Sequence, residues 1–126
     1  MSIETKEIIL EFEKAGTAKG IVKRYLAPLT VERFMKKLPI FSTANLIQGI
    51  IFIPVDLMIG FEKSKNSIKE RELFYIPQNK AIGISFKNYN KLPFKVNPMG
   101  EVTNESLYVL NNIRRGERVK ILLKNK

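Results

Sequence analysis

The sequence predicts a mainly β protein, a β-barrel whose ends are covered by helices. Many short stretches of the 126 residues alternate apolar and polar side chains, which is the period-two pattern of half-buried strands. Two stretches instead carry apolar residues at helical spacing. A chain of this length fits one domain, residues 1–126, and many short strands beside two helices favour a barrel with helical caps.

The N-terminal region predicts a β-hairpin. Glu7–Lys14 alternates apolar and acidic residues, as expected for a strand with one face buried. Ala15–Thr17 follows as a turn that contains a glycine, and Ala18–Tyr25 is predicted to be the partner strand.

A helix is predicted after this hairpin. Thr30 can cap its first turn, because a Thr hydroxyl accepts a hydrogen bond from an otherwise unpaired backbone N–H. Pro39 ends the helix at Leu38, since the residue before a proline is driven out of the helical conformation. The apolar side chains at positions i, i+3, i+4 and i+7 form one stripe: Val31, Phe34, Met35 and Leu38.

Three strands are predicted in the middle of the chain. Gly49–Val55 is nearly all apolar, which is typical of a strand buried on both faces, and Pro54 marks its end, an edge or a bulge. After a charged loop at Phe61–Ser67, Leu73–Ile76 predicts a short strand. Large and small residues alternate in Ala81–Phe86, so the small face allows another segment to pack closely against this strand.

The C-terminal region predicts a strand, a short helix and a final strand. Val96–Thr103 is predicted to be a strand that a proline and a glycine interrupt. Asn104 can cap the helix, and Gly116 can supply the left-handed residue that ends it. Arg118–Lys124 alternates again and closes the chain as a strand.

Composition excludes several kinds of chemistry. The chain has no His and no Cys, so it contains no Ser-His-Asp triad, no Cys nucleophile, no disulfide and no zinc site built from those residues. We expect no cofactor, since neither a phosphate-binding loop nor a dinucleotide fingerprint is present. The N-terminus lacks a targeting signal, and the longest apolar stretch, Ile50–Phe61, is shorter than the about 20 residues of a membrane span. We therefore expect a soluble cytoplasmic protein.

The positive charge is concentrated in the second half of the chain. Of the formal net charge of +10, residues 1–60 carry +2 and residues 61–126 carry +8. A basic half is typical of a protein that attracts nucleic acid, an acidic protein or an anionic membrane surface, of which the membrane is not expected here. A bias of the whole proteome, as in a thermophile, is the other explanation, because Lys and Ile are each 16 of the 126 residues.

Three segments of the chain resemble cyclophilins. Ala27–Phe34 is similar to the segment that opens the first helix of cyclophilins, and Ala81–Phe86 to the apolar strand that lines their peptide groove. Val96–Val102 is similar to the segment that precedes their last helix and strand. Through Leu38–Ile40 and Tyr75–Pro77 the chain also resembles a family of small prokaryotic cyclophilin-like proteins of unknown function.

The resemblance implies a closed eight-stranded barrel that is capped by two short α-helices. Cyclophilins use an Arg guanidinium beside an apolar proline pocket, helped by Gln, His and Trp side chains. In this chain the His position falls near Val96 and the Trp position near Lys91, while Phe41–Val55, where the Arg is expected, contains neither Arg nor Lys. An apolar groove is still expected, and its candidate residues are Phe52, Tyr75, Phe86, Leu92 and Phe94.

We therefore predict a non-catalytic barrel that binds a peptide, a protein or a small ligand at the apolar groove. A weak peptidyl-prolyl cis-trans isomerase is the alternative. A second alternative is a nucleic-acid-binding barrel, because the segment 87–95 mixes cations for phosphates with aromatic rings for bases. The candidate residues of this basic loop are Lys87, Tyr89, Lys91 and Lys95.

Two further carboxylate sites have a chemical and a structural interpretation. Asp56 is the only Asp and lies among apolar neighbours, so it is either a base with a raised pKa or, more commonly, a turn residue bonded to the backbone. Glu70 and Glu72 would share a face of a strand, as a carboxylate pair or as part of a solvated edge strand.

Overall fold

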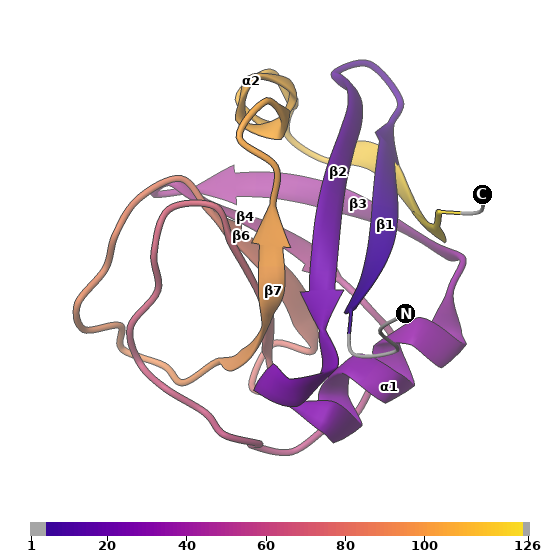
Figure 1. The fold of residues 1–126 in the computed structure, drawn as a ribbon. Helices are drawn as coiled ribbons and strands as arrows, with labels where there is room; N and C mark the ends of the chain where they lie inside the picture. Colours follow the sequence, from indigo (N-terminus) through magenta and orange to yellow (C-terminus); the bar gives the residue numbers. More distant parts are fainter. Residues whose placement is uncertain (1–4, 125–126) are drawn as a thin grey trace.

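Eight antiparallel strands close into a barrel in the computed structural model, which describes residues 5–124 (Figure 1). Around the barrel the strands follow the order β1-β2-β7-β5-β6-β4-β3-β8, and β8 pairs with β1 to close it. The structure therefore confirms the predicted mainly β fold. The strands are β1 (Thr5–Phe12), β2 (Gly16–Lys23), β3 (Ile40–Ile47), β4 (Ile50–Pro54), β5 (Glu72–Ile76), β6 (Ala81–Ser85), β7 (Asn97–Val102) and β8 (Glu117–Leu123).

Two α-helices lie at opposite ends of the barrel (Figure 1). Helix α1 (Pro28–Lys37) follows a single 3-10 turn, η1 (Arg24–Leu26), and α2 (Ser106–Leu110) precedes β8. Phe34 of α1 and Leu110 of α2 are fully buried in the same cluster as the interior of the barrel. Each helix thus closes one end of the barrel with apolar side chains. Among the residues that the structure describes, no helix is long and apolar enough to cross a membrane.

The interior of the barrel is filled by every second residue of its strands. Leu73 and Tyr75 of β5 belong to the interior cluster, whereas Phe74 between them belongs to a second cluster outside the barrel. The same alternation separates Ile51 from Ile50 in β4. The prediction that the strand 49–55 is buried on both faces is therefore confirmed, and the outward residues need a cover of their own.

Three neighbouring strands form the covered outer surface, which we call the outer wall. Phe52 of β4, Gly83 of β6 and Phe74 of β5 are register partners and therefore point to the same side. The ring of Phe74 lies directly over Gly83, and a Cβ atom at position 83 would be 2.2 Å from Cε1 of Phe74. The small face of the strand 81–86 thus allows close packing, as the sequence predicted.

Helix α1 begins differently from the prediction. Its N-cap is Ala27 and Pro28 is its first residue, so Thr30 lies inside the first turn, where it is fully buried. Glu62 from a distant loop satisfies the free N–H groups instead, because its carboxylate accepts hydrogen bonds from the backbone N–H of Leu29 (2.9 Å) and Thr30 (2.8 Å). The prediction that Thr30 caps the helix was wrong, while its end before Pro39 is confirmed.

The ends of α2 also differ from the prediction. Glu105 is the N-cap and makes no side-chain capping bond, so Asn104 does not cap this helix. Gly116 has a left-handed backbone with φ of 72°, but it lies in the turn before β8 and not directly after the helix. The glycine is therefore needed for the turn, because its φ is one that other residues rarely adopt.

We predict that Gly83→Ala destabilises the protein by about 1–3 kcal/mol, because the added methyl group overpacks the outer wall against Phe74. Urea denaturation at neutral pH measures this change. Gly60→Ala is the control, since nothing lies within 4 Å of its added Cβ. In a Phe74→Ala background the cost of Gly83→Ala should disappear, and a cost that persists there would contradict the contact.

Candidate functional site

The residues predicted to line a groove lie in three different places. Phe52, Leu92 and Phe94 come together in the cluster on the outer wall. Tyr75 points into the barrel and is fully buried, and Phe86 packs against the interior cluster beside α2. The five candidate residues therefore do not line one continuous surface.

Tyr75 has a structural role at the end of the barrel that α1 covers. Its hydroxyl donates a hydrogen bond to the backbone oxygen of Leu57 at 2.6 Å and accepts one from the backbone N–H of Ile59 at 3.3 Å. Burial raises the pKa of Tyr75 above its ordinary value of 10.0, despite the bond from Ile59. The phenol is thus a neutral anchor for the segment that follows β4.

Two long loops, residues 61–71 and 87–96, cover the outer wall. They pair with each other through short antiparallel bridges, one between Lys65 and Val96 and one between Ile68 and Tyr89. Backbone hydrogen bonds run both ways at each bridge, and Leu92 donates a further one at 2.6 Å to the oxygen of Asn66. Ile68, Leu92 and Val96 are buried against the wall, so the chain's own side chains occupy this face.

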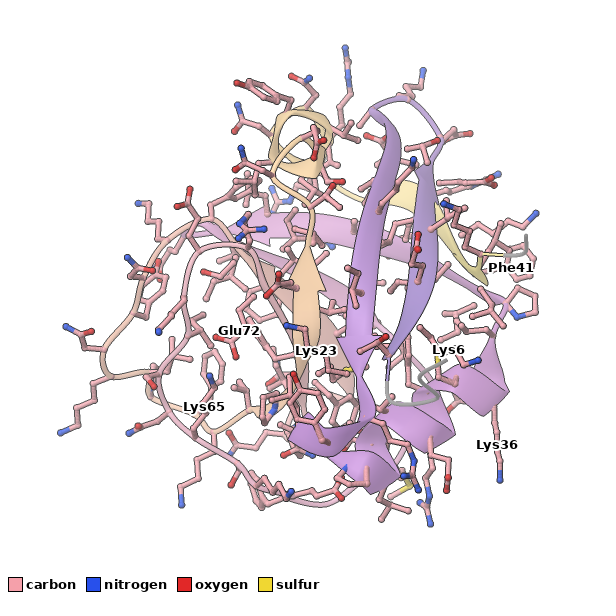
Figure 2. All side chains as sticks on the ribbon, in the orientation of Figure 1. Lys6, Lys23, Lys36, Phe41, Lys65 and Glu72 are labelled. Atoms are coloured by element: carbon pink, nitrogen blue, oxygen red, sulfur yellow. The ribbon has the colours of Figure 1, made fainter. Side chains whose placement is uncertain are left out.

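An ion pair also ties the first of these loops to the barrel. Lys65 lies 2.6 Å from Glu72 of β5, and Figure 2 shows the two side chains together. The Glu72 carboxylate also accepts a hydrogen bond from the backbone N–H of Lys69 at 3.0 Å. Glu70 is exposed and lies before β5, so Glu70 and Glu72 form neither a carboxylate pair nor a solvated edge strand.

The basic loop presents its charges without free aromatic rings. Lys87, Lys91 and Lys95 are exposed. Tyr89 is half-buried against the outer wall, and its hydroxyl donates a hydrogen bond to the backbone oxygen of Gln48. Phe94 also packs on this cluster. The two rings therefore anchor the loop, whereas a stacking platform for bases needs exposed rings.

Glu117 is a buried carboxylate that joins the β1–β2 turn to the turn before β8. It accepts hydrogen bonds from the backbone N–H groups of Lys14 (2.6 Å), Ala15 (2.6 Å) and Arg114 (2.8 Å). Burial alone would raise the pKa of Glu117, but these three donors and the charge of Arg114 outweigh it and hold the pKa below its ordinary value. Such a group stays ionised and does not serve as a general acid near neutral pH.

A second carboxylate network joins α1 to the loop 57–62. Besides the hydrogen bonds from two N–H groups of α1, the Glu62 carboxylate accepts one from the hydroxyl of Thr30 at 2.7 Å. Desolvation raises the pKa of Glu62, whereas these hydrogen bonds and the charge of Lys63 lower it, with a net shift below its ordinary value. The buried amide of Asn97 completes the network by donating to Thr30 Oγ1 and to the oxygen of Gly60.

Asp56 is not the buried base that its apolar neighbours in sequence suggested. Its side chain is 98% exposed, and the nearest cation is Lys37 at 4.0 Å. Asp56 thus lies exposed at a bend just after the end of β4, and its carboxylate is not buried among the apolar neighbours.

Comparisons with known proteins identify the architecture. No family model matches the chain, and no curated protein does either. A hypothetical protein of Archaeoglobus fulgidus, known from a solution structure, is similar over 96% of each chain, with a TM-score of 0.80 and 26% identity. A cyclophilin-type peptidyl-prolyl cis-trans isomerase of Cryptosporidium parvum has a TM-score of 0.66 and 10% identity, over 97% of this chain and 99% of that chain.

The chain has a cyclophilin-like fold. In this fold β3 and β4 form the stretch in which the resemblance predicts a catalytic Arg. Their outward residues include Thr43 and Asn45 of β3 beside Phe52 of β4, and neither strand contains an Arg or a Lys. The amide oxygen of Asn45 accepts the backbone N–H of Gly116 at 2.9 Å. This part of the cyclophilin-like barrel therefore presents neutral side chains.

The structure also shows a surface feature that was not predicted from the sequence. The segment after β4 has no regular structure, yet it exposes Met58 and Phe61 beside a hollow of about 400 Å³. A signal was present, because the apolar run Ile50–Phe61 continues beyond Pro54, where the strand ends. Apolar residues outside a strand or helix need either a core or a partner to cover them.

We predict that Glu117→Gln destabilises the protein by about 1–3 kcal/mol at neutral pH, since one oxygen acceptor becomes an amide donor facing backbone N–H groups. Because folding lowers the pKa of Glu117, its stabilisation is full above the ordinary value of 4.5 and is lost as the pH falls through the folded value.

Urea denaturation at neutral pH and in acid tests this linkage. The stability gap between wild type and Glu117→Gln should narrow below about pH 4.5, the ordinary pKa. Glu105→Gln, on the exposed turn before α2, is the matched control. A gap that stays constant with pH would contradict the structural role of the charge.

Proposed function

We propose that this protein is a non-catalytic member of the cyclophilin-like fold that binds a peptide, a protein or a small ligand. The exposed Met58 and Phe61 beside a hollow support binding. The state of the outer wall supports the absence of catalysis. The side chains of Ile68, Leu92 and Phe74 fill the face formed by β4, β6 and β5, and β3 and β4 carry no cation. A barrel of this kind retains a rigid scaffold for recognition without the groups that catalysis requires.

Isomerisation of a prolyl bond requires a fixed electrostatic group and an open pocket. The barrier is about 18–20 kcal/mol and falls when amide resonance is lost, which a donor aimed at the twisting amide promotes. The chain has no His and no Trp, and its Arg residues lie outside β3 and β4. Arg71, the Arg next to β5, donates a guanidinium N–H to the backbone oxygen of Val102 at 3.0 Å, so it has a structural contact with β7.

We predict no acceleration of prolyl isomerisation in a protease-coupled assay with a short Xaa-Pro peptide. The rate should equal that of buffer over the whole range of protein concentration, because no donor meets the amide. An active cyclophilin at the same concentration is the positive control. A rate that rises in proportion to the concentration of this protein would contradict the proposal and favour a weak isomerase.

A further inference from the structure

The surface beside Met58 and Phe61 carries several of the exposed large apolar side chains of this protein. Met58 is 75% exposed and Phe61 is 58% exposed, and Tyr25 of η1 and Leu29 of α1 are also exposed. We call Tyr25, Leu29, Met58 and Phe61 the α1 surface. Scattered apolar residues are normal on proteins, but a group of them on one surface indicates an interaction site.

Three hydrogen bonds place the segment that carries Met58 and Phe61 alongside η1 and α1. The segment 58–63 runs antiparallel to η1 and α1, since Lys63 Nζ donates to the oxygen of Tyr25 at 3.1 Å and the N–H of Leu29 donates to Glu62 at 2.9 Å. At the other end of the segment, the guanidinium of Arg33 donates to the oxygen of Met58 at 3.3 Å. Leu29 and Arg33 are four residues apart in α1, so they lie on one side of this helix.

The segment is held rigidly although it has no regular secondary structure. Tyr75 holds Leu57 and Ile59, and the side chain of Asn97 donates to the oxygen of Gly60 at 2.9 Å and accepts the N–H of Glu62 at 3.0 Å. Asn97 and Tyr75 are fully buried. Because the backbone of the segment is already ordered, binding costs little backbone entropy, which favours affinity.

A hollow lies between this segment and the β5–β6 turn. Its volume of about 400 Å³ is in the range of small binding pockets, which is about 300–1,000 Å³. Ile59, Gly60 and Pro77 contribute apolar walls, and Met58 and Phe61 flank them. The hollow is large enough to receive an apolar side chain of a partner.

The charges around the α1 surface are mainly positive. Lys80 lines the hollow, and Lys63 and Arg33 border the segment. The carboxylate of Glu62 is already occupied by three donors from α1. Asp56 faces Lys37 at 4.0 Å and Glu32 of α1 faces Arg24 at 3.6 Å, which leaves Lys63, Lys80 and Arg33 against the ionised Glu62. Such a rim attracts a negatively charged partner.

We infer that the α1 surface binds an acidic peptide segment that inserts one large apolar side chain into the hollow. The inference rests on the proposed function as a binding barrel and names its site and the chemistry of its ligand. Phe61 and Met58 supply the apolar contact, and Lys63 and Lys80 supply the charge. A second copy of this chain would bring the same cations to the interface, since each copy carries a net charge of +10.

Selection from a phage library of random short peptides on immobilised wild-type protein tests the inference. Peptides that also bind the double variant Met58→Ser/Phe61→Ser are removed. The enriched sequences should combine Asp and Glu with an aromatic or aliphatic residue. No enrichment, or enrichment of basic or purely polar peptides, would overturn the inference.

Affinities of a synthesised selected peptide sharpen the test. Phe61→Ser should weaken binding at least about tenfold, as for a central aromatic contact, and Lys63→Glu/Lys80→Glu should weaken it and flatten its dependence on salt. Phe41→Ser is the matched control, because Phe41 is 72% exposed on β3 with Lys120 over its ring, and it lies beside residues of β1 and β8 and not in the hollow of Met58 and Phe61. It should leave the affinity unchanged.

Other occupants give different results. If every peptide that binds the wild type also binds the double variant Met58→Ser/Phe61→Ser equally well, the peptide site lies elsewhere, which overturns this inference while the proposed binding function stands. Two further outcomes would overturn it as well. One is a dimer in sedimentation that Phe61→Ser dissociates. The other is binding to anionic phosphatidylserine vesicles that Phe61→Ser abolishes, when no peptide binds. Prolyl isomerase activity would instead overturn the proposed function.

Discussion

The contact between the Phe74 ring and Gly83 decides which side of this barrel is available to a ligand. Because β6 carries a glycine at the register position between Phe52 and Phe74, the ring of Phe74 occupies the space into which a side chain would otherwise project. The loops 61–71 and 87–96 then pack over this layer with Ile68 and Leu92. A barrel wall that is buried on both faces is stabilised by two apolar layers, and it has no room for a substrate between them.

The polar side chains of the interior follow from the same arrangement. A loop that crosses the end of the barrel without regular structure leaves backbone groups unpaired, and buried backbone groups require partners. Tyr75 and Asn97 provide them for the segment after β4, Glu62 provides them for the first turn of α1, and Glu117 provides them for the turns near α2. The polar groups of these side chains are therefore already hydrogen-bonded within the protein. The side chains near α1 that are still exposed to a partner are apolar or cationic.

Much of the barrel could be predicted from the sequence, because alternating apolar and polar residues indicate a strand buried on one face and a continuous apolar run indicates a strand buried on both faces. The strand 49–55 and the small face of the strand 81–86 are examples. Strand β3 gives no such signal, since its exposed Phe41 and Ile47 break the alternation. The site was harder to predict for a physical reason. Tyr75 and Phe86 resemble groove residues in sequence, but only the register shows that Tyr75 points inward, and the partnership of Glu62 with α1 joins residues 32 positions apart.

Native-state hydrogen exchange tests most directly whether the outer wall is permanently closed. The amide groups of Ile68, Tyr89 and Val96 hold the two loops together, whereas that of Ile84 lies in the barrel. If the loops are part of the core, these amides and that of Ile84 should exchange through the same global unfolding, with opening free energies that agree within about 1 kcal/mol. Fast exchange of the three loop amides, with Ile84 still protected, would show that the loops open like a lid and that the wall is an accessible groove.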